Sequence, residues 1–385
     1  MNKIAIISEF NRNSVNYGNR LQAMALNQYL RKNYSSIQLE YLYFSFYDNF
    51  TITKKPNIKN QIKRGINFII NLKSKLNRIY STKIIKNRLI ACESFSIKNM
   101  TLANKAYIWS DLKNSDFDTI IIGSDVVWTQ INGKIGKLRF LDFELSKPFN
   151  RIAYAASFGR DWIPKENISE IQRCLKKFNA ISVRENSSVK LLDSIGIKSI
   201  HTVDPTLLLS KNEWIQYEQK PKKVKNNEKY IFVYLLGTDK TMRKNIKIWA
   251  KENTLKIITI PYACGTYNKF DSKFGDLQIM DCSPESWLWL IRHAEYVLTD
   301  SFHGSVFSTI FEKKLVVLER KEKIDINNRM IDFMNMIKQS NKIIKYEELE
   351  CIKNLNWNYL EINKILQKEI EHSKKFINDA LKKYI

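Results

Sequence analysis

The chain alternates short apolar runs with segments of helical periodicity along most of its length. Runs such as residues 117–122 and 151–156 are largely apolar, which is typical of strands buried on both faces of a parallel sheet. This alternation predicts an α/β protein with parallel sheets. Further strands are expected at 3–8, 180–183, 199–203, 230–236, 255–260, 295–298 and 315–318, and helices at 21–31, 186–195, 240–252, 284–294 and 304–313.

Polar residues gather where the expected strands end. Gly123-Ser124-Asp125 follows one strand, Arg184-Glu185 follows another, and Asp204-Pro205 follows a third. Because the carboxyl ends of parallel strands meet at one edge of a sheet, these clusters indicate a ligand-facing edge.

The length of 385 residues is enough for two domains of ~150 residues each. A Lys- and Asn-rich stretch at 210–228 is the expected boundary between them. We therefore expect an N-terminal Rossmann-like domain at 1–210, a second one at 211–345, and a C-terminal helical tail at 346–385.

Residues 53–90 are rich in Lys and Arg, and Ile or Leu recurs among them every three or four positions. This pattern predicts a basic amphipathic helix inserted in the first domain, with a break near Gly65. It favours a surface helix whose apolar stripe packs on the protein. The alternative is a helix that lies on an anionic membrane surface.

The net charge of +24 suits nucleic acid, an anionic membrane or anionic ligands, although Lys and Asn can also be enriched by nucleotide bias in the genome. No nucleic-acid-binding motif accompanies the charge, so nucleic acid is not an expected partner. Five scattered Cys without a C-x-x-C spacing argue against disulfides and zinc, and no metal is expected. Without a signal peptide or an apolar run of membrane-spanning length, a cytoplasmic protein is expected, with a peripheral position at the inner face of the membrane left open.

The most informative junction is Thr299-Asp300-Ser301-Phe302-His303-Gly304-Ser305, which lies between an expected strand and an expected helix. Helix N-termini at such positions favour anions, and His303 is one of only four His in the chain. The alternative is structural: Ser301 caps the helix, and His303 belongs to its first turn.

Taken in order, these clusters resemble the polysaccharide pyruvyl transferase family. Asn328-Arg329 resembles the end of the family pattern, and Val126 departs from it, because the family often has Gln there. The matching pieces cover residues 1–340: Asn16-Tyr17-Gly18-Asn19 with Leu21-Gln22 and Ala25-Leu26, Gly123-Ser124-Asp125 with Trp128, Tyr154–Gly159, Ile181–Glu185, Val203–Thr206 and Thr299–Gly304.

The resemblance implies a glycosyltransferase-B-like fold, in which two Rossmann-like domains face a cleft. It also implies transfer of pyruvate from phosphoenolpyruvate to two hydroxyls of a sugar, as a ketal, with release of phosphate. The acceptor would be an oligosaccharide or lipid-linked glycan of a bacterial surface polysaccharide. Phosphoenolpyruvate is then the donor substrate, and no cofactor is expected.

The donor carries a phosphate and a carboxylate, and its enol carbon must gain a proton, which calls for cations and a general acid. The resemblance indicates that His303 acts on the donor, as the general acid or as an imidazolium that binds the phosphate, and Ser301 and Gly304 are expected beside the donor. Arg184 could reach the donor from the first domain, or it could pair with Glu185 or another carboxylate. Further candidate phosphate partners are Lys321 and Arg329.

The acceptor is expected in the first domain. Asp125 is the candidate base for the sugar hydroxyl, with helix capping as its alternative, and Trp128 could stack on a sugar or pack in the core. The other expected acceptor residues are Asn16, Tyr17, Gly18, Asn19, Gln22 and Ser124. Two other functions stay open: a nucleotide-sugar glycosyltransferase of the same fold, and a non-catalytic anion- or membrane-binding protein.

Overall fold

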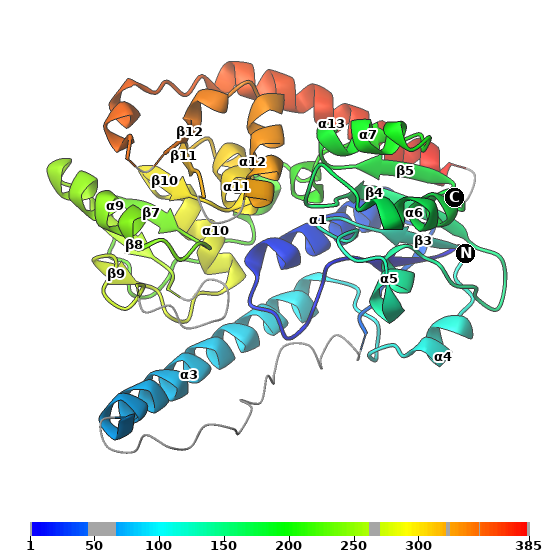
Figure 1. Ribbon diagram of the computed structural model, residues 1–385, viewed down its shortest axis with the longest axis horizontal. Helices are drawn as coiled ribbons and strands as arrows, with labels where there is room; N and C mark the ends of the chain where they lie inside the picture. The colour runs from blue at the N-terminus through cyan, green and yellow to red at the C-terminus, as the bar shows by residue number, and fades with distance from the viewer. Residues whose placement is uncertain (1, 45–66, 262–269, 321–323, 346, 383–385) are drawn as a thin grey trace.

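A computed structural model describes residues 2–44, 67–261, 270–320, 324–345 and 347–382. It contains two six-stranded sheets, one in each half of the described chain (Figure 1). The first has the order β2-β1-β3-β4-β5-β6, and the second has the order β12-β11-β10-β7-β8-β9. The first sheet is made of β1 (Lys3–Ile7), β2 (Gln38–Tyr41), β3 (Thr119–Ile122), β4 (Asn150–Ala156), β5 (Ala180–Val183) and β6 (Ile200–His201). The second is made of β7 (Tyr230–Tyr234), β8 (Lys256–Thr259), β9 (Leu277–Gln278), β10 (Tyr296–Thr299), β11 (Lys314–Leu318) and β12 (Ile343–Ile344).

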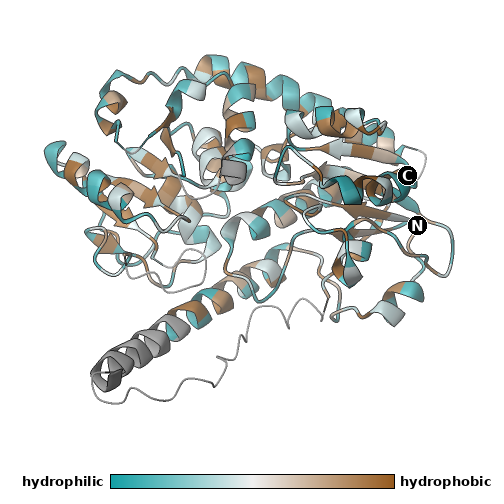
Figure 2. Cartoon of the chain, in the orientation of Figure 1, coloured by the Kyte–Doolittle hydropathy of each residue, from teal (hydrophilic) through white to brown (hydrophobic). Residues whose placement is uncertain are grey.

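All the strand pairs within the two sheets are parallel. The central strands are buried along their length, which explains why they read as continuous apolar runs and not as alternating ones. Figure 2 shows these apolar strands inside a more hydrophilic layer of helices. The short edge strands β2, β9 and β12 were not expected from the sequence.

Helices cover the sheets. The first half contains α1 (Tyr17–Asn33), α3 (Asn67–Asn99), α4 (Trp109–Lys113), α5 (Gly133–Arg139), α6 (Ile168–Leu175), α7 (Asn186–Ser194) and α8 (Lys211–Ile215). The second contains α9 (Lys240–Glu252), α10 (Pro284–Arg292), α11 (Phe302–Ile310), α12 (Ile324–Met336) and α13 (Tyr359–Leu381). Helix α1 begins four residues before the predicted helix because the Asn16 side chain accepts a hydrogen bond from the Asn19 N–H and caps it.

The C-terminal helix α13 returns to the first half of the chain (Figure 1). Its Ser373 Oγ accepts a hydrogen bond of 2.9 Å from the Val203 N–H, and Glu369 lies 3.1 Å from Nδ1 of His201. The C-terminal tail therefore follows the second half in the chain but packs against the first half.

Helix α3 extends away from the body at its N-terminal end, and its C-terminal part lies between the halves (Figure 1). Buried Arg88 donates to the Met280 carbonyl at 2.7 Å, and Ser96 accepts from Arg20 of α1 at 2.7 Å. The described α3 is one continuous helix. Residues 53–66 of the predicted segment 53–90, with the expected break near Gly65, lie outside the described residues. No described helix combines the length and the apolar character needed to cross a bilayer.

Candidate active site

Helix α11 brings His303 to the carboxyl edge of the second sheet. Ser301 is the N-cap residue, and its Oγ accepts a hydrogen bond of 3.3 Å from the Gly304 N–H. The predicted capping role of Ser301 is thus present, and the Gly304 N–H is already hydrogen-bonded within the cap. Asp300 accepts hydrogen bonds from the backbone N–H groups of Leu236 and Gly237, at 2.7 and 2.8 Å, and holds the junction against the end of β7.

The first half of the chain meets His303 at Gly18, in the first turn of α1. A Cβ on Gly18 would lie 2.1 Å from Nδ1 of His303, far inside van der Waals contact. Gly18 therefore makes room for the imidazole of the other half, and its predicted part in acceptor binding stays a prediction.

Arg184, which directly follows β5, is enclosed by three carboxylates. Its Nη1 lies 2.9 Å from Asp204 and 3.3 Å from Asp125, and its Nε donates to Glu185 at 3.0 Å. Its guanidinium also lies over the ring of Phe302, 4.2 Å from the centroid. The predicted alternative of a salt bridge is present, and it fixes the plane of the guanidinium.

Asp204 joins Arg184 to His303. Its Oδ2 lies 3.5 Å from Nε2 of His303, and its Oδ1 accepts from the backbone and hydroxyl of Thr206 at 3.0 and 2.8 Å. Burial raises the pKa of Asp204, but the charges of His303 and Arg184 outweigh burial and hold it well below its usual value. Asp204 is therefore a carboxylate that lies between Arg184 and the imidazole of His303.

Asp125 plays a similar part for two arginines. Its Oδ1 lies 3.3 Å from Arg184 and 3.5 Å from Nη1 of Arg329, which comes from α12 in the second half. Burial raises the pKa of Asp125, but the charges of Arg184, His303 and Arg329 lower it by more than burial raises it. The net result is a lowered pKa. A carboxylate paired in this way is a weak base, so in this arrangement Asp125 holds Arg184 and Arg329, and its role as the base for the sugar hydroxyl stays a prediction.

Three buried nitrogens around these carboxylates have no hydrogen-bond partner among the described residues. They are Nη2 of Arg184, Nε of Arg329 and Nε2 of His303, whose contact with Asp204 is too long for a hydrogen bond. A small cavity here is lined by residues that include Arg184, Asp204, Phe302 and Arg329. Buried donors are normally paired, so these nitrogens are candidates for binding an anion, although the cavity of about 10 Å³ beside them has room for about one water molecule as it stands.

Most of the predicted acceptor residues are occupied within the protein. Tyr17 is buried and donates to the Cys282 carbonyl at 2.8 Å. Gln22 donates to Ser8 and accepts from the backbone N–H of Ser124, whose own hydroxyl donates to the Ala155 carbonyl. These residues shape the loop, and their polar groups are not directed to a ligand.

The predicted stacking of Trp128 on a sugar is wrong. Its ring is enclosed by Phe140, Phe158 and Phe178, and its Nε1 donates to the Arg139 carbonyl at 3.1 Å. With 1% of its surface exposed, the ring has no free face for a sugar, and the core-packing alternative is correct. Asn16 is occupied as the cap of α1, and Asn19 donates to the Glu9 carbonyl at 2.8 Å. Lys321 lies outside the described residues.

The sequence interpretation missed two carboxylates of this region. Asp204 was noted only as a strand end and within the family-like segment Val203–Thr206, although its position after β6 beside the end of β5 is the signal that could have identified it as a site residue. Glu9 comes two residues after β1, and it pairs with Arg139. Burial raises the pKa of Glu9, Arg139 lowers it, and the Asp125 charge raises it, with a raised pKa as the net result.

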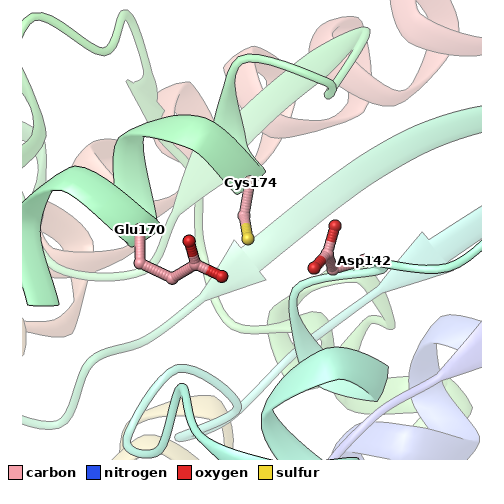
Figure 3. Close-up of side chains that lie close together, drawn as sticks. All are labelled: Asp142, Glu170 and Cys174. Atoms are coloured by element: carbon pink, nitrogen blue, oxygen red, sulfur yellow. The ribbon is translucent and has the colours of Figure 1, made fainter.

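One described cluster has the composition of a metal site, but its charges are already satisfied. Figure 3 shows Glu170 and Cys174 of α6 facing Asp142, with ligand atoms within 4.8 Å of one another. Asp142 pairs with Arg173 at 2.6 Å and with Lys177 at 2.8 Å, and Arg173 also binds Glu170. We assign this cluster to surface ion pairing.

Comparison with known proteins identifies the family. The sequence model for polysaccharide pyruvyl transferase matches residues 16–322, which contain every element of the site except Glu9 and Arg329. The chain belongs to the polysaccharide pyruvyl transferase family. The predicted membership is thereby confirmed, and the enzyme is a transferase. No curated protein matches the chain significantly.

Solved structures share the fold at low sequence identity. A Staphylococcus aureus MnaA–UDP co-structure is 12% identical with a TM-score of 0.54, over 98% of this chain and 97% of that one. A UDP-N-acetylglucosamine 2-epimerase from Rickettsia bellii is 10% identical with a TM-score of 0.50, over 100% and 99% of the two chains. The predicted fold class, two Rossmann-like halves of the glycosyltransferase-B type with a C-terminal helix, is confirmed.

Proposed function

We propose that this pyruvyl transferase takes pyruvate from phosphoenolpyruvate and places it, as a ketal, on a sugar of a surface polysaccharide or its lipid-linked precursor. The observation that carries the proposal is the set of unpartnered donors of Arg184, Arg329 and His303 beside two carboxylates. Phosphoenolpyruvate presents two anionic groups, and guanidinium groups bind both carboxylate and phosphate through paired N–H donors.

In the proposed reaction, Arg184 and Arg329 bind the anionic groups of the donor. His303 protonates the methylene carbon, so that C2 becomes electrophilic and a sugar hydroxyl adds to it and loses its proton. Phosphate then leaves with the C2–O bond electrons, and the second hydroxyl adds and loses its proton to close the ketal. Asp204 supports this role, because its carboxylate lies 3.5 Å from Nε2 of His303 and helps to position the ring.

Turnover tests the proposal directly. Purified protein is incubated with phosphoenolpyruvate and candidate oligosaccharides, and both phosphate release and the mass gain of the glycan are measured. His303→Gln should lower turnover ~10²–10⁴-fold, the usual contribution of a general acid, while donor binding persists. His372→Ala, an exposed His on α13, is the matched control and should retain full turnover. Near-normal turnover in His303→Gln would refute the assignment.

A nucleotide sugar is the alternative donor for the same fold. Stabilisation against heat by UDP-sugars, with none by phosphoenolpyruvate, would favour it. If a well-folded protein turns over neither phosphoenolpyruvate nor a nucleotide sugar, the non-catalytic alternative would be favoured.

We also propose that the α3 region contacts an anionic membrane, where a lipid-linked acceptor would lie. The support is the basic sequence of 53–90 and two exposed apolar side chains on the described α3, Ile90 and Ile97. Co-flotation with anionic vesicles should be lost when residues 53–82 are deleted, and equal flotation would contradict the idea.

A further inference from the structure

The loop that follows β4 carries an exposed tryptophan at the ligand-facing edge of the first sheet. Trp162 is 46% exposed, and it is the one aromatic residue among the exposed large hydrophobic side chains of the described residues. An exposed indole leaves a large apolar surface in water, so its position beside a candidate site invites a functional explanation.

Arg160 holds this indole from one side. Its guanidinium lies 4.5 Å from the Trp162 ring centroid, and its Nη2 donates to the Thr129 carbonyl at 3.4 Å. Arg160 Nε is buried and has no hydrogen-bond partner in the described part of the chain. The ring is therefore backed by a positioned cation, and an unused donor lies beside it.

Thr129 connects this pair to Glu9. The Thr129 hydroxyl, at an exposed residue, accepts from Arg139 Nη1 at 3.2 Å, and Nη2 of the same arginine pairs with Glu9. The Glu9 side chain is partly exposed, and its backbone carbonyl accepts a hydrogen bond from Asn19, next to Gly18, which lies against His303. Glu9, Thr129 and Trp162 follow β1, β3 and β4, which are neighbours in the sheet.

We infer that Trp162, Arg160, Thr129 and Glu9 form the acceptor subsite, in which a hexose ring lies face-on against the indole. Sugar rings present C–H groups on one face and hydroxyls around the edge, so they suit an aromatic surface bordered by a carboxylate and a guanidinium. Glu9 accepts hydrogen bonds from the hydroxyls, and Arg160 supports the face of the indole opposite to the sugar. The subsite adjoins the donor site, because Val126, next to Asp125, lies against Gly159 of the Trp162 loop. The inference rests on the proposed function only in calling this sugar the acceptor.

Sugar binding to this subsite can be measured without turnover. The protein is labelled with 5-fluorotryptophan, and the ¹⁹F resonance of Trp162 is assigned as the one missing in Trp162→Phe. Methyl glycosides of glucose, galactose, mannose and N-acetylglucosamine are then titrated. We expect at least one to shift the Trp162 resonance in a saturable way while that of Trp109, assigned through Trp109→Phe, stays in place. No shift with any glycoside, or equal shifts of both resonances, would overturn the subsite.

Turnover then separates the two proposals. With an accepted oligosaccharide, Trp162→Ala should raise the acceptor KM by about 3- to 10-fold, the amount expected from one aromatic stacking contact, with the KM for phosphoenolpyruvate unchanged. Leu360→Ala, which removes an 87% exposed side chain on α13, is the control and should change neither. If the Trp162 resonance responds to sugars and phosphoenolpyruvate is never consumed, the subsite stands and the donor assignment falls. An unchanged acceptor KM in Trp162→Ala would refute the subsite even if the enzyme is active.

Discussion

Gly18→Ala tests whether the first helix is built around His303. The added Cβ would lie 2.1 Å from Nδ1 and 2.5 Å from Cγ of the imidazole, where ordinary contact begins at 3.4 Å. The ring must therefore move by about 1.3 Å or rotate, and its 3.5 Å contact with Asp204 is lost. Such overpacking costs ~1–3 kcal/mol, of which the better helix propensity of Ala recovers ~1 kcal/mol.

We expect Gly18→Ala to lower the free energy of unfolding by roughly 0–2 kcal/mol but to lower turnover ~10²-fold, because displacing a catalytic group by about 1 Å has that effect. Urea unfolding and phosphate release measure the two quantities. The decisive control is the double variant with His303→Ala, where the space is free and Gly18→Ala should no longer destabilise. Additive losses of stability in the double variant would refute the reasoning.

Other predictions follow from single contacts. Arg184→Lys keeps the charge but loses the fork that spans Asp125, Asp204 and Glu185, so the KM for phosphoenolpyruvate should rise at least ~10-fold, measured by steady-state kinetics. Tyr17→Phe removes one buried hydrogen bond and should cost ~1 kcal/mol in urea unfolding without changing the acceptor KM, which an acceptor-binding Tyr17 would change. Burial lowers the pKa of Lys342 to about 8, so the folded state binds fewer protons than the unfolded state between pH 8 and the usual lysine pKa. Stability should therefore rise with pH across that window in urea unfolding, and Lys342→Met should flatten the rise.

Local sequence pattern was sufficient for the strands and for the junctions between strand and helix. Parallel strands must be apolar on both faces, so β3 and β10 could be identified without any knowledge of their neighbours. The same holds for His303, because a strand, an N-cap Ser and a helix are consecutive in the chain. The meeting of Gly18 with His303 could not be derived in this way, since it depends on how two halves of the chain pack.

The two tryptophans show the same limit from the other side. Trp128 and Trp162 both follow strands of the first sheet, and sequence pattern gives no means to tell which is exposed. Trp128 is enclosed by three Phe side chains from different elements, whereas the short loop after β4 leaves Trp162 in solvent. Burial of an aromatic residue is a tertiary property, and single-sequence reasoning therefore could not establish that Trp128 lies in the core.

The site exists only where the halves meet, and this has a mechanistic consequence. Asp204 and Asp125 come from the first half, and their partners His303 and Arg329 come from the second. A hinge motion that admits the donor would break both contacts at once, and closure would restore both. The acid would thus be assembled only around an enclosed donor, which keeps water from C2 after protonation, where hydrolysis would give free pyruvate instead of transfer. Other contacts across the same boundary, such as the 2.5 Å hydrogen bond that Ser187 donates to Asp332, should therefore affect the ratio of transfer to hydrolysis more than donor affinity.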